Sequence, residues 1–192
     1  MNYGRYIFYM CYNQDMKTIA IFGHRQFNNK NLKQRLKSEI EKHICDGVQI
    51  LVGTHGDFDA MAISVCRELI KQHPNVKITA VLTTLTPLQK GSKELYSAID
   101  LYRDIETMTY EIEEVYFKKQ IVVSNQHMVD DSDLIICYVD MNKRKSGAKK
   151  AVRYAMKQGK DIVNLFKETD NIFYGMTEEE KEIEWKRFIQ KQ

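Results

Sequence analysis

Short apolar runs alternate with amphipathic segments along most of the chain. The apolar runs have the length and the β-branched content of buried strands, and they cover residues 17–22, 48–52, 76–82, 134–139 and 162–166. Apolar residues recur every three to four positions over residues 28–45, 59–72 and 147–158, which predicts helices there. Strands that alternate with helices favour a parallel sheet covered by helices on both faces, so we predict an α/β fold.

The helix predicted at residues 147–158 carries its apolar residues on one side. We expect this side to face the sheet, and it is formed by Ala148, Val152, Ala155 and Met156. Gly159 follows directly, and glycine at this position is typical of the end of a helix.

Residues 83–131 have a less regular pattern. A spacing of three residues connects four of their apolar and aromatic members, Tyr96, Ile99, Tyr102 and Ile105. Acidic residues crowd around these positions, so we predict a partly helical insertion over residues 83–114 near the mouth of a pocket. Residues 115–123 are predicted to form a short strand that turns into a helix through Asp131.

The two ends of the chain differ from the α/β domain, which we place at residues 16–166. Residues 1–15 form an N-terminal extension, which is either a start-site extension or a short accessory strand. Residues 167–192 are predicted to be a C-terminal helical tail, because Thr177 and Glu180 have the spacing of a capping box. The tail helix has an apolar side formed by Ile183, Trp185, Phe188 and Ile189. This side docks either on the same domain or on a second copy of the chain, which would make a homo-oligomer.

Composition limits the classes of function. The 192 residues are 43% hydrophobic, which suits one α/β domain with an appendage. The 29 basic and 26 acidic residues give a net charge of +3, which is too balanced to indicate nucleic-acid binding by itself. No run reaches the ~18 apolar residues of a membrane span, so we predict no membrane partner. The four cysteines form no C-x-x-C pair, which is typical of reduced thiols in a cytoplasmic protein.

Two junctions between a predicted strand and a predicted helix are rich in glycine. The first is Gly53-Thr54-His55-Gly56-Asp57-Phe58-Asp59, and the second is Lys145-Ser146-Gly147-Ala148. The first N–H groups of a helix have no partner within the helix, and glycine lets the backbone approach an anion closely. Ligands bind at the carboxyl ends of parallel strands, where both junctions lie. The sequence therefore predicts a phosphate pocket at this edge of the sheet.

The candidate ligand-binding residues lie at these junctions, at the end of the first strand and before the fourth. They are Gly23, His24, Arg25, Gly53, Gly56, Asp57, Asp59, Asn125, Ser146 and Gly147. The glycines either admit a ligand or make ordinary turns. Arg25 either holds a phosphate or forms a surface ion pair, and Asp59 either caps a helix or binds a ribose hydroxyl. Asn125 either contacts a base or ribose or caps a helix.

A basic cluster surrounds the second junction. Its members are Lys143, Arg144, Lys145, Lys149, Lys150 and Arg153. Beside a helix N-terminus this charge attracts phosphates, and the alternative is a solvated basic face. No aromatic residues are interleaved with the cluster, which disfavours stacking on single-stranded nucleic acid.

No metal site and no required cofactor are predicted. His24 and His55 lie on adjacent predicted loops, but the sequence offers no third ligand at a suitable spacing. We therefore interpret His24 as a neutral hydrogen-bonding group.

The motifs at four of these junctions together resemble the SLOG superfamily. They are Ile21-Phe22-Gly23-His24-Arg25, the stretch from Gly53 to Asp59, the stretch from Ser124 to Asp133, and Ser146-Gly147-Ala148. The resemblance covers about residues 17–166, and the chain is most similar to the small bacterial and phage proteins of the DUF1273 type. It implies a Rossmann-like fold that holds nucleotides or nucleotide-derived molecules. Relatives in the superfamily include cytokinin-activating phosphoribohydrolases and the DNA-processing protein that loads single strands during transformation.

The sequence departs from the hydrolase branch at both catalytic positions of that branch. The hydrolases have an arginine where this chain has Ser124-Asn125-Gln126, and a glutamate on the turn where this chain has Lys145 to Arg153 without an acid. Cleavage of an N-glycosidic bond needs stabilisation of a cationic sugar and activation of water. The departures favour a protein that is not an enzyme, and Asp57 and Asp59 are the candidate catalytic groups if it is one.

Three functions are consistent with the sequence. The leading one is sensing or sequestering a nucleotide-derived small molecule, such as an ADP-ribose- or cyclic-nucleotide-type ligand. The second is a nucleotide N-glycosidase that uses Asp57 or Asp59. The third is a single-stranded DNA-binding module that uses the surface from Lys143 to Arg153.

Overall fold

Strands and helices alternate along the chain. The structure is a computed structural model, and it describes residues 16–27, 29–44, 47–83, 102–110, 112, 114–144, 146–167, 170, 179, 180 and 183. The strands are β1 (Lys17–Gly23), β2 (Val48–Gly53), β3 (Val76–Leu82), β4 (Glu106–Thr109), β5 (Leu134–Tyr138) and β6 (Asp161–Asn164). The helices are α1 (Leu32–Glu41), α2 (Asp57–Gln72), α4 (Phe117–Asp130) and α5 (Gly147–Lys157).

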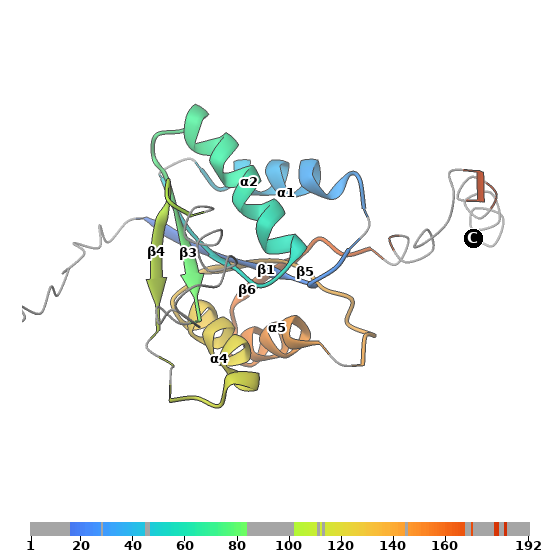
Figure 1. Cartoon of the computed structure of the whole chain (residues 1–192). Coiled ribbons are helices and arrows are strands. Elements are labelled where there is room, and N and C mark those ends of the chain that lie inside the picture. The colour runs from blue at the N-terminus through green and yellow to red at the C-terminus, as the bar shows by residue number, and fades with distance from the viewer. Residues whose placement is uncertain are drawn as a thin grey trace, which may run out of the picture.

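The strands form one sheet in the order β4-β3-β2-β1-β5-β6, and every neighbouring pair is parallel. Helices α1 and α2 cover one face, and α4 and α5 cover the other (Figure 1). In the central register, Ile19 lies opposite Ile50 of β2 and Leu134 of β5. The order therefore reverses at β1, because the chain builds outward to β4 on one side and to β6 on the other. The predicted Rossmann-like α/β fold is confirmed.

Two apolar clusters fill the space between the sheet and its two helical layers. Ile19 and Ile21 of β1 pack with residues of α1 and α2, whereas Ala20 and Phe22 pack with residues of α4 and α5. Alternate side chains of a strand point to opposite faces, so a strand covered on both faces is apolar at most of its positions. This explains the apolar runs of the inner strands, which are interrupted in β2 and β3 by Gln49, Lys77 and Thr79.

Some predicted helix boundaries and faces are wrong by a few residues. Helix α1 spans Leu32–Glu41 rather than residues 28–45, and α2 begins at Asp57, two residues earlier than predicted. Met156 was expected to face inward, but 57% of its surface is exposed. The buried stripe of α5 consists of Ala148, Ala151, Val152 and Ala155. Met156 lies at the edge of this stripe and therefore points to solvent.

The region between β3 and β5 contains the largest corrections. Glu106–Thr109 forms the edge strand β4 instead of part of a helical insertion, and residues 84–101 lie outside the described residues. The short strand predicted at residues 115–123 is wrong, because helix α4 begins at Phe117. An edge strand has one neighbour and is only partly buried, so the polar sequence of β4 carries no apolar run to reveal it.

The predictions for the two ends of the chain fall mostly outside the described residues. This holds for the extension at residues 1–15 and for Trp185, Phe188 and Ile189 of the tail. Ile183 is described, and its side chain is exposed.

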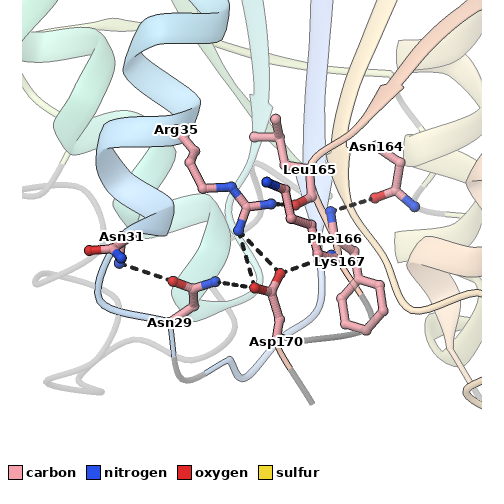
Figure 2. A network of polar contacts seen from close by, with 8 residues as sticks. All are labelled: Asn29, Asn31, Arg35, Asn164, Leu165, Phe166, Lys167 and Asp170. Carbon is pink, nitrogen blue, oxygen red and sulfur yellow. Dashed lines mark hydrogen bonds and ion pairs between the residues drawn. The ribbon is translucent and has the colours of Figure 1, made fainter. Parts of the chain in front are cut away.

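A polar network holds the chain after β6 against the beginning of α1 (Figure 2). The Asp170 carboxylate accepts hydrogen bonds from Asn29 Nδ2 at 2.7 Å, from Arg35 Nη1 at 3.2 Å and from the N–H of Lys167 at 2.9 Å. Arg35 also donates to the carbonyl oxygen of Leu165. The side chains of Arg35 and Asp170 are 23% and 8% exposed, so their ion pair is largely shielded from solvent.

Replacing Asp170 should destabilise the fold. Asp170→Ala removes the shared acceptor and leaves the Arg35 guanidinium without its ionic partner, so we expect the free energy of unfolding to fall by about 2–4 kcal/mol. Urea denaturation followed by circular dichroism measures this change. Asp104→Ala is the matched control, because it breaks the exposed pair with Arg67 and should change stability little. Equal losses in both variants would contradict the structural role of the network.

Candidate functional site

A cleft of about 670 Å³ lies at the carboxyl edge of the sheet. Its walls come from the ends of β1, β2 and β3, the first turn of α2, one side of α4 and the junction between β5 and α5. Parallel sheets bind ligands where the strand order reverses, and this cleft lies at the reversal between β1 and β5. Its volume is in the range of small-molecule sites.

The cleft brings together eight of the ten predicted binding residues. They are Gly23, His24, Arg25, Gly53, Asp59, Asn125, Ser146 and Gly147. Gly56 and Asp57 do not line it. Asp57 is exposed at the first position of α2, and its N–H donates to the carbonyl oxygen of Arg25 at 2.8 Å.

The glycines predicted as binding residues differ in what the structure requires of them. A Cβ on Gly23 would lie 2.5 Å from Cδ1 of Phe58, and one on Gly56 would lie 2.7 Å from Cα of Arg25. Both glycines are therefore required by the packing of the protein itself. A Cβ on Gly147 would meet only Val122, at 3.9 Å. Internal packing does not require a glycine at position 147, which opens directly onto the cleft.

His24 connects the end of β1 to the junction before α5. Its Nε2 accepts a hydrogen bond from the N–H of Asp140 at 2.8 Å, and its Nδ1 lies 3.4 Å from Oγ of Ser146. Burial lowers the pKa of His24, the positive charge of Lys143 lowers it further, and Asp140 opposes both effects. An Nε2 that accepts a hydrogen bond carries no proton, so this geometry supports the neutral imidazole that the sequence suggested.

Asp59 is the buried acid of the cleft. Its side chain is 8% exposed, and Oδ2 accepts a hydrogen bond from the N–H of His55 at 2.9 Å. Burial raises the pKa of Asp59 to about 6, although the hydrogen bond from His55 and the charge of Arg25 act in the opposite direction. The N-cap of α2 is Gly56, so Asp59 does not cap this helix but lies in its first turn.

His55 forms the wall beside Asp59. Its Nε2 lies 3.1 Å from Oγ1 of Thr83 at the end of β3. Burial lowers the pKa of His55, and the charge of Arg25 lowers it further. Both histidines of the cleft are therefore disposed to be neutral at pH 7.

The cleft has a basic lining. Arg25, Lys143, Arg144 and Lys150 line it, and Asp59 is the one acid among the described lining residues. Lys149 belongs to the predicted basic cluster, but its Nζ donates to the carbonyl oxygen of Lys143 at 3.2 Å and holds the loop. Four cations against one carboxyl group that ionises only near pH 6 make an environment suited to an anion.

Helix α4 contributes lining residues that sequence reasoning did not identify. Ile121, Val122 and Ser124 join Asn125 on the wall of the cleft. These positions lie on neighbouring turns of one helix, so a helical prediction for residues 117–130 would have grouped them. Phe22, His55 and Val81 were likewise not predicted as binding residues, and each lies at or just after the carboxyl end of a strand.

The described part of the chain contains no group of three or more His, Cys, Asp or Glu side chains that could hold a metal ion. None of its helices is both long enough and apolar enough to cross a membrane. Cys66 and Cys137 are buried, and burial raises the pKa of each thiol to about 12, so both are unreactive.

The raised pKa of Asp59 makes stability depend on pH. The carboxyl group titrates near 3.8 when unperturbed and near 6 in the fold, so the folded protein binds more protons in this window and loses stability as the pH rises through it. Asp59→Asn removes the cost of burying a charge. We expect it to raise the free energy of unfolding by about 2–3 kcal/mol at about pH 8, and not at about pH 4.

Urea denaturation of both proteins across this pH range measures the effect. The other titrating groups are common to both proteins, so the difference between the two curves isolates Asp59. A difference that stays constant with pH would contradict the raised pKa.

Comparison with known proteins supports the fold and gives the family. The fold matches the X-ray structure of DNA processing protein A from Streptococcus pneumoniae with a TM-score of 0.54 and 18% sequence identity, over 92% of this chain and 56% of that chain. At this identity the similarity concerns the fold alone, and this chain spans little more than half the length of that protein. No curated protein matches the sequence. The model of the YspA SLOG family matches residues 14–169, which include every strand and helix that surrounds the cleft, and the chain therefore belongs to this family.

Proposed function

We propose that the protein binds a phosphate-bearing nucleotide or nucleotide-derived molecule in the cleft, and that it senses or sequesters this ligand. The observation that carries the proposal is the convergence of four basic side chains on a cleft of about 670 Å³ at the point where the strand order reverses. Membership of the SLOG family supports it, because the resemblance to the SLOG superfamily implies a fold that holds nucleotides or nucleotide-derived molecules.

The proposed ligand lies with its phosphates toward α5. The N–H groups of Gly147 and Ala148 are the first two of this helix, and neither has a hydrogen-bond partner among the described residues. Free N–H groups at a helix N-terminus favour an anion, and Lys143, Arg144 and Lys150 add charge beside them. The ribose and base then extend toward Asp59 and Asn125, whose side chains offer hydrogen-bonding groups on the other walls.

The proposal predicts a retained or stabilising nucleotide. Heating the purified protein and recording the mass of released small molecules tests for a retained ligand, and thermal-shift measurements against a nucleotide panel test for binding. We expect at least one nucleotide to raise the melting temperature of the wild type and to be recovered unaltered. Stabilisation by no nucleotide, together with steeply salt-dependent binding of single-stranded DNA, would overturn the proposal in favour of a DNA-binding module.

Two substitutions locate the binding site. Arg25→Ala removes one cation, and Gly147→Asp places a carboxylate where the phosphates are proposed to lie, so each should reduce the nucleotide-induced shift. Position 147 has space for a side chain, and an acid in the first turn of a helix is favourable, so Gly147→Asp should fold normally. Gly147→Ala is the matched control for the added Cβ. Unchanged binding in both Arg25→Ala and Gly147→Asp would mean that the pocket is misplaced.

Asp59 supports a second candidate function, an N-glycosidase acting on nucleotides. A carboxyl group whose pKa lies near 6 in a cleft suits general acid–base catalysis, whereas Asp57 lies outside the cleft lining. Incubation with nucleoside monophosphates and chromatography of the products tests this function. Release of free base by the wild type, and its loss in Asp59→Asn, would establish that the protein is an N-glycosidase. Recovery of an unaltered nucleotide would favour binding without catalysis.

A further inference from the structure

The hydroxyl group of Ser146 has a defined set of hydrogen bonds. Its Oγ accepts from the N–H of Lys149 at 3.1 Å, as the N-cap of α5. Its second neighbour is Nδ1 of His24 at 3.4 Å. A serine hydroxyl can accept two hydrogen bonds and donate one, so the protonation of Nδ1 decides in which direction the Ser146 proton points.

The backbone of Asp140 settles the protonation of His24. The N–H of Asp140 donates to Nε2 at 2.8 Å, so Nε2 must be the unprotonated nitrogen, and a neutral imidazole then carries its proton on Nδ1. The opposite tautomer would place two N–H groups against each other. With Nδ1 as a donor, both accepting positions of Ser146 Oγ are used, and the hydroxyl proton is left to point elsewhere.

We propose that His24 is a positioning residue, which orients the Ser146 hydroxyl as an obligatory donor toward a phosphate oxygen of the bound ligand. The proposal rests on the proposed function, because it assigns a role within the same cleft. Ser146 lines that cleft beside Gly147, whose N–H is a second donor without a partner among the described residues. In this proposal His24, which also lines the cleft, acts on the ligand through Ser146.

The orientation has a consequence for selectivity. A hydroxyl that can only donate, beside free N–H groups, binds an oxygen that has lone pairs and no proton. A phosphate or pyrophosphate presents such oxygens. An amino group or another pure donor finds no acceptor there. The α5 end of the cleft is therefore selective for anionic oxygens through hydrogen-bond direction, in addition to charge.

The tautomer can be observed without any ligand. Long-range ¹H–¹⁵N NMR spectra of the histidine rings distinguish Nδ1–H, Nε2–H and doubly protonated imidazoles, and comparison with His24→Leu identifies the signals of His24 among the five histidines. We expect the neutral Nδ1–H form near pH 7. Detection of the Nε2–H form, or of a charged ring, would overturn the proposal whether or not a nucleotide binds.

Binding measurements then test the role of the orientation. The probes are ADP and inorganic pyrophosphate, titrated by calorimetry at one fixed salt concentration. His24→Leu should weaken binding of both about five- to tenfold, because the donor is no longer held toward the phosphate. His24→Asn keeps an N–H at the position of Nδ1 and should bind within about threefold of the wild type. His73→Leu is the control, since His73 lies at the far end of α2 and does not line the cleft.

A double-mutant cycle separates positioning from a general structural role. If His24 acts through Ser146, then His24→Leu should weaken binding no further in a protein that already carries Ser146→Ala. Additive losses would overturn the proposal. If the wild type binds the probes and His24→Leu binds them equally well, this inference alone is overturned. If the wild type binds neither probe, the proposed phosphate site is overturned together with this inference.

Discussion

The position of β1 in the sheet determines where the molecule can hold a ligand. Its hydrogen bonds are shared between β2 on one side and β5 on the other, so every later strand must extend outward from one of these two neighbours. The connections after β1 and after β5 pass to opposite faces of the sheet, since α1 and α5 lie on different sides (Figure 1). The two connections diverge at the carboxyl edge, and the cleft occupies the space that they leave.

Backbone hydrogen bonds and one close ring contact join the walls of this space. The N–H of His24 donates to the carbonyl oxygen of Tyr138, and that of Asp57 donates to Arg25, so the loop after β1 is fastened both to β5 and to α2. Gly23 lets the ring of Phe58 lie directly against the strand, where it stacks on Tyr138 at a centroid distance of 6.0 Å. Gly23 and Gly56, which suggested a ligand site in the sequence, thus serve first to join these elements.

The parts of the fold that sequence reasoning predicted well are those buried on both faces. The run from Ile19 to Phe22 is buried and apolar at every position, whereas Glu106 and Thr107 of the edge strand are exposed and carry no such signal. The site was predictable where it lies beside strand ends. The contribution of Ser124 could not be predicted, because it depends on which face α4 turns toward the cleft. The tautomer of His24 could not be predicted either, because the hydrogen bond that sets it comes from a backbone N–H. Any residue at position 140 except proline would supply this N–H.

A buried acid that titrates near pH 6 would couple binding of the proposed ligand to the exchange of protons with solvent. A ligand hydroxyl that donates to Asp59 stabilises the ionised carboxylate, so its arrival expels a proton and its apparent affinity rises with pH. A ligand that presents a lone pair to the same group does the reverse and takes a proton up. The heat of association would then vary with the ionisation enthalpy of the buffer, and the sign of that variation would reveal which kind of atom lies against Asp59.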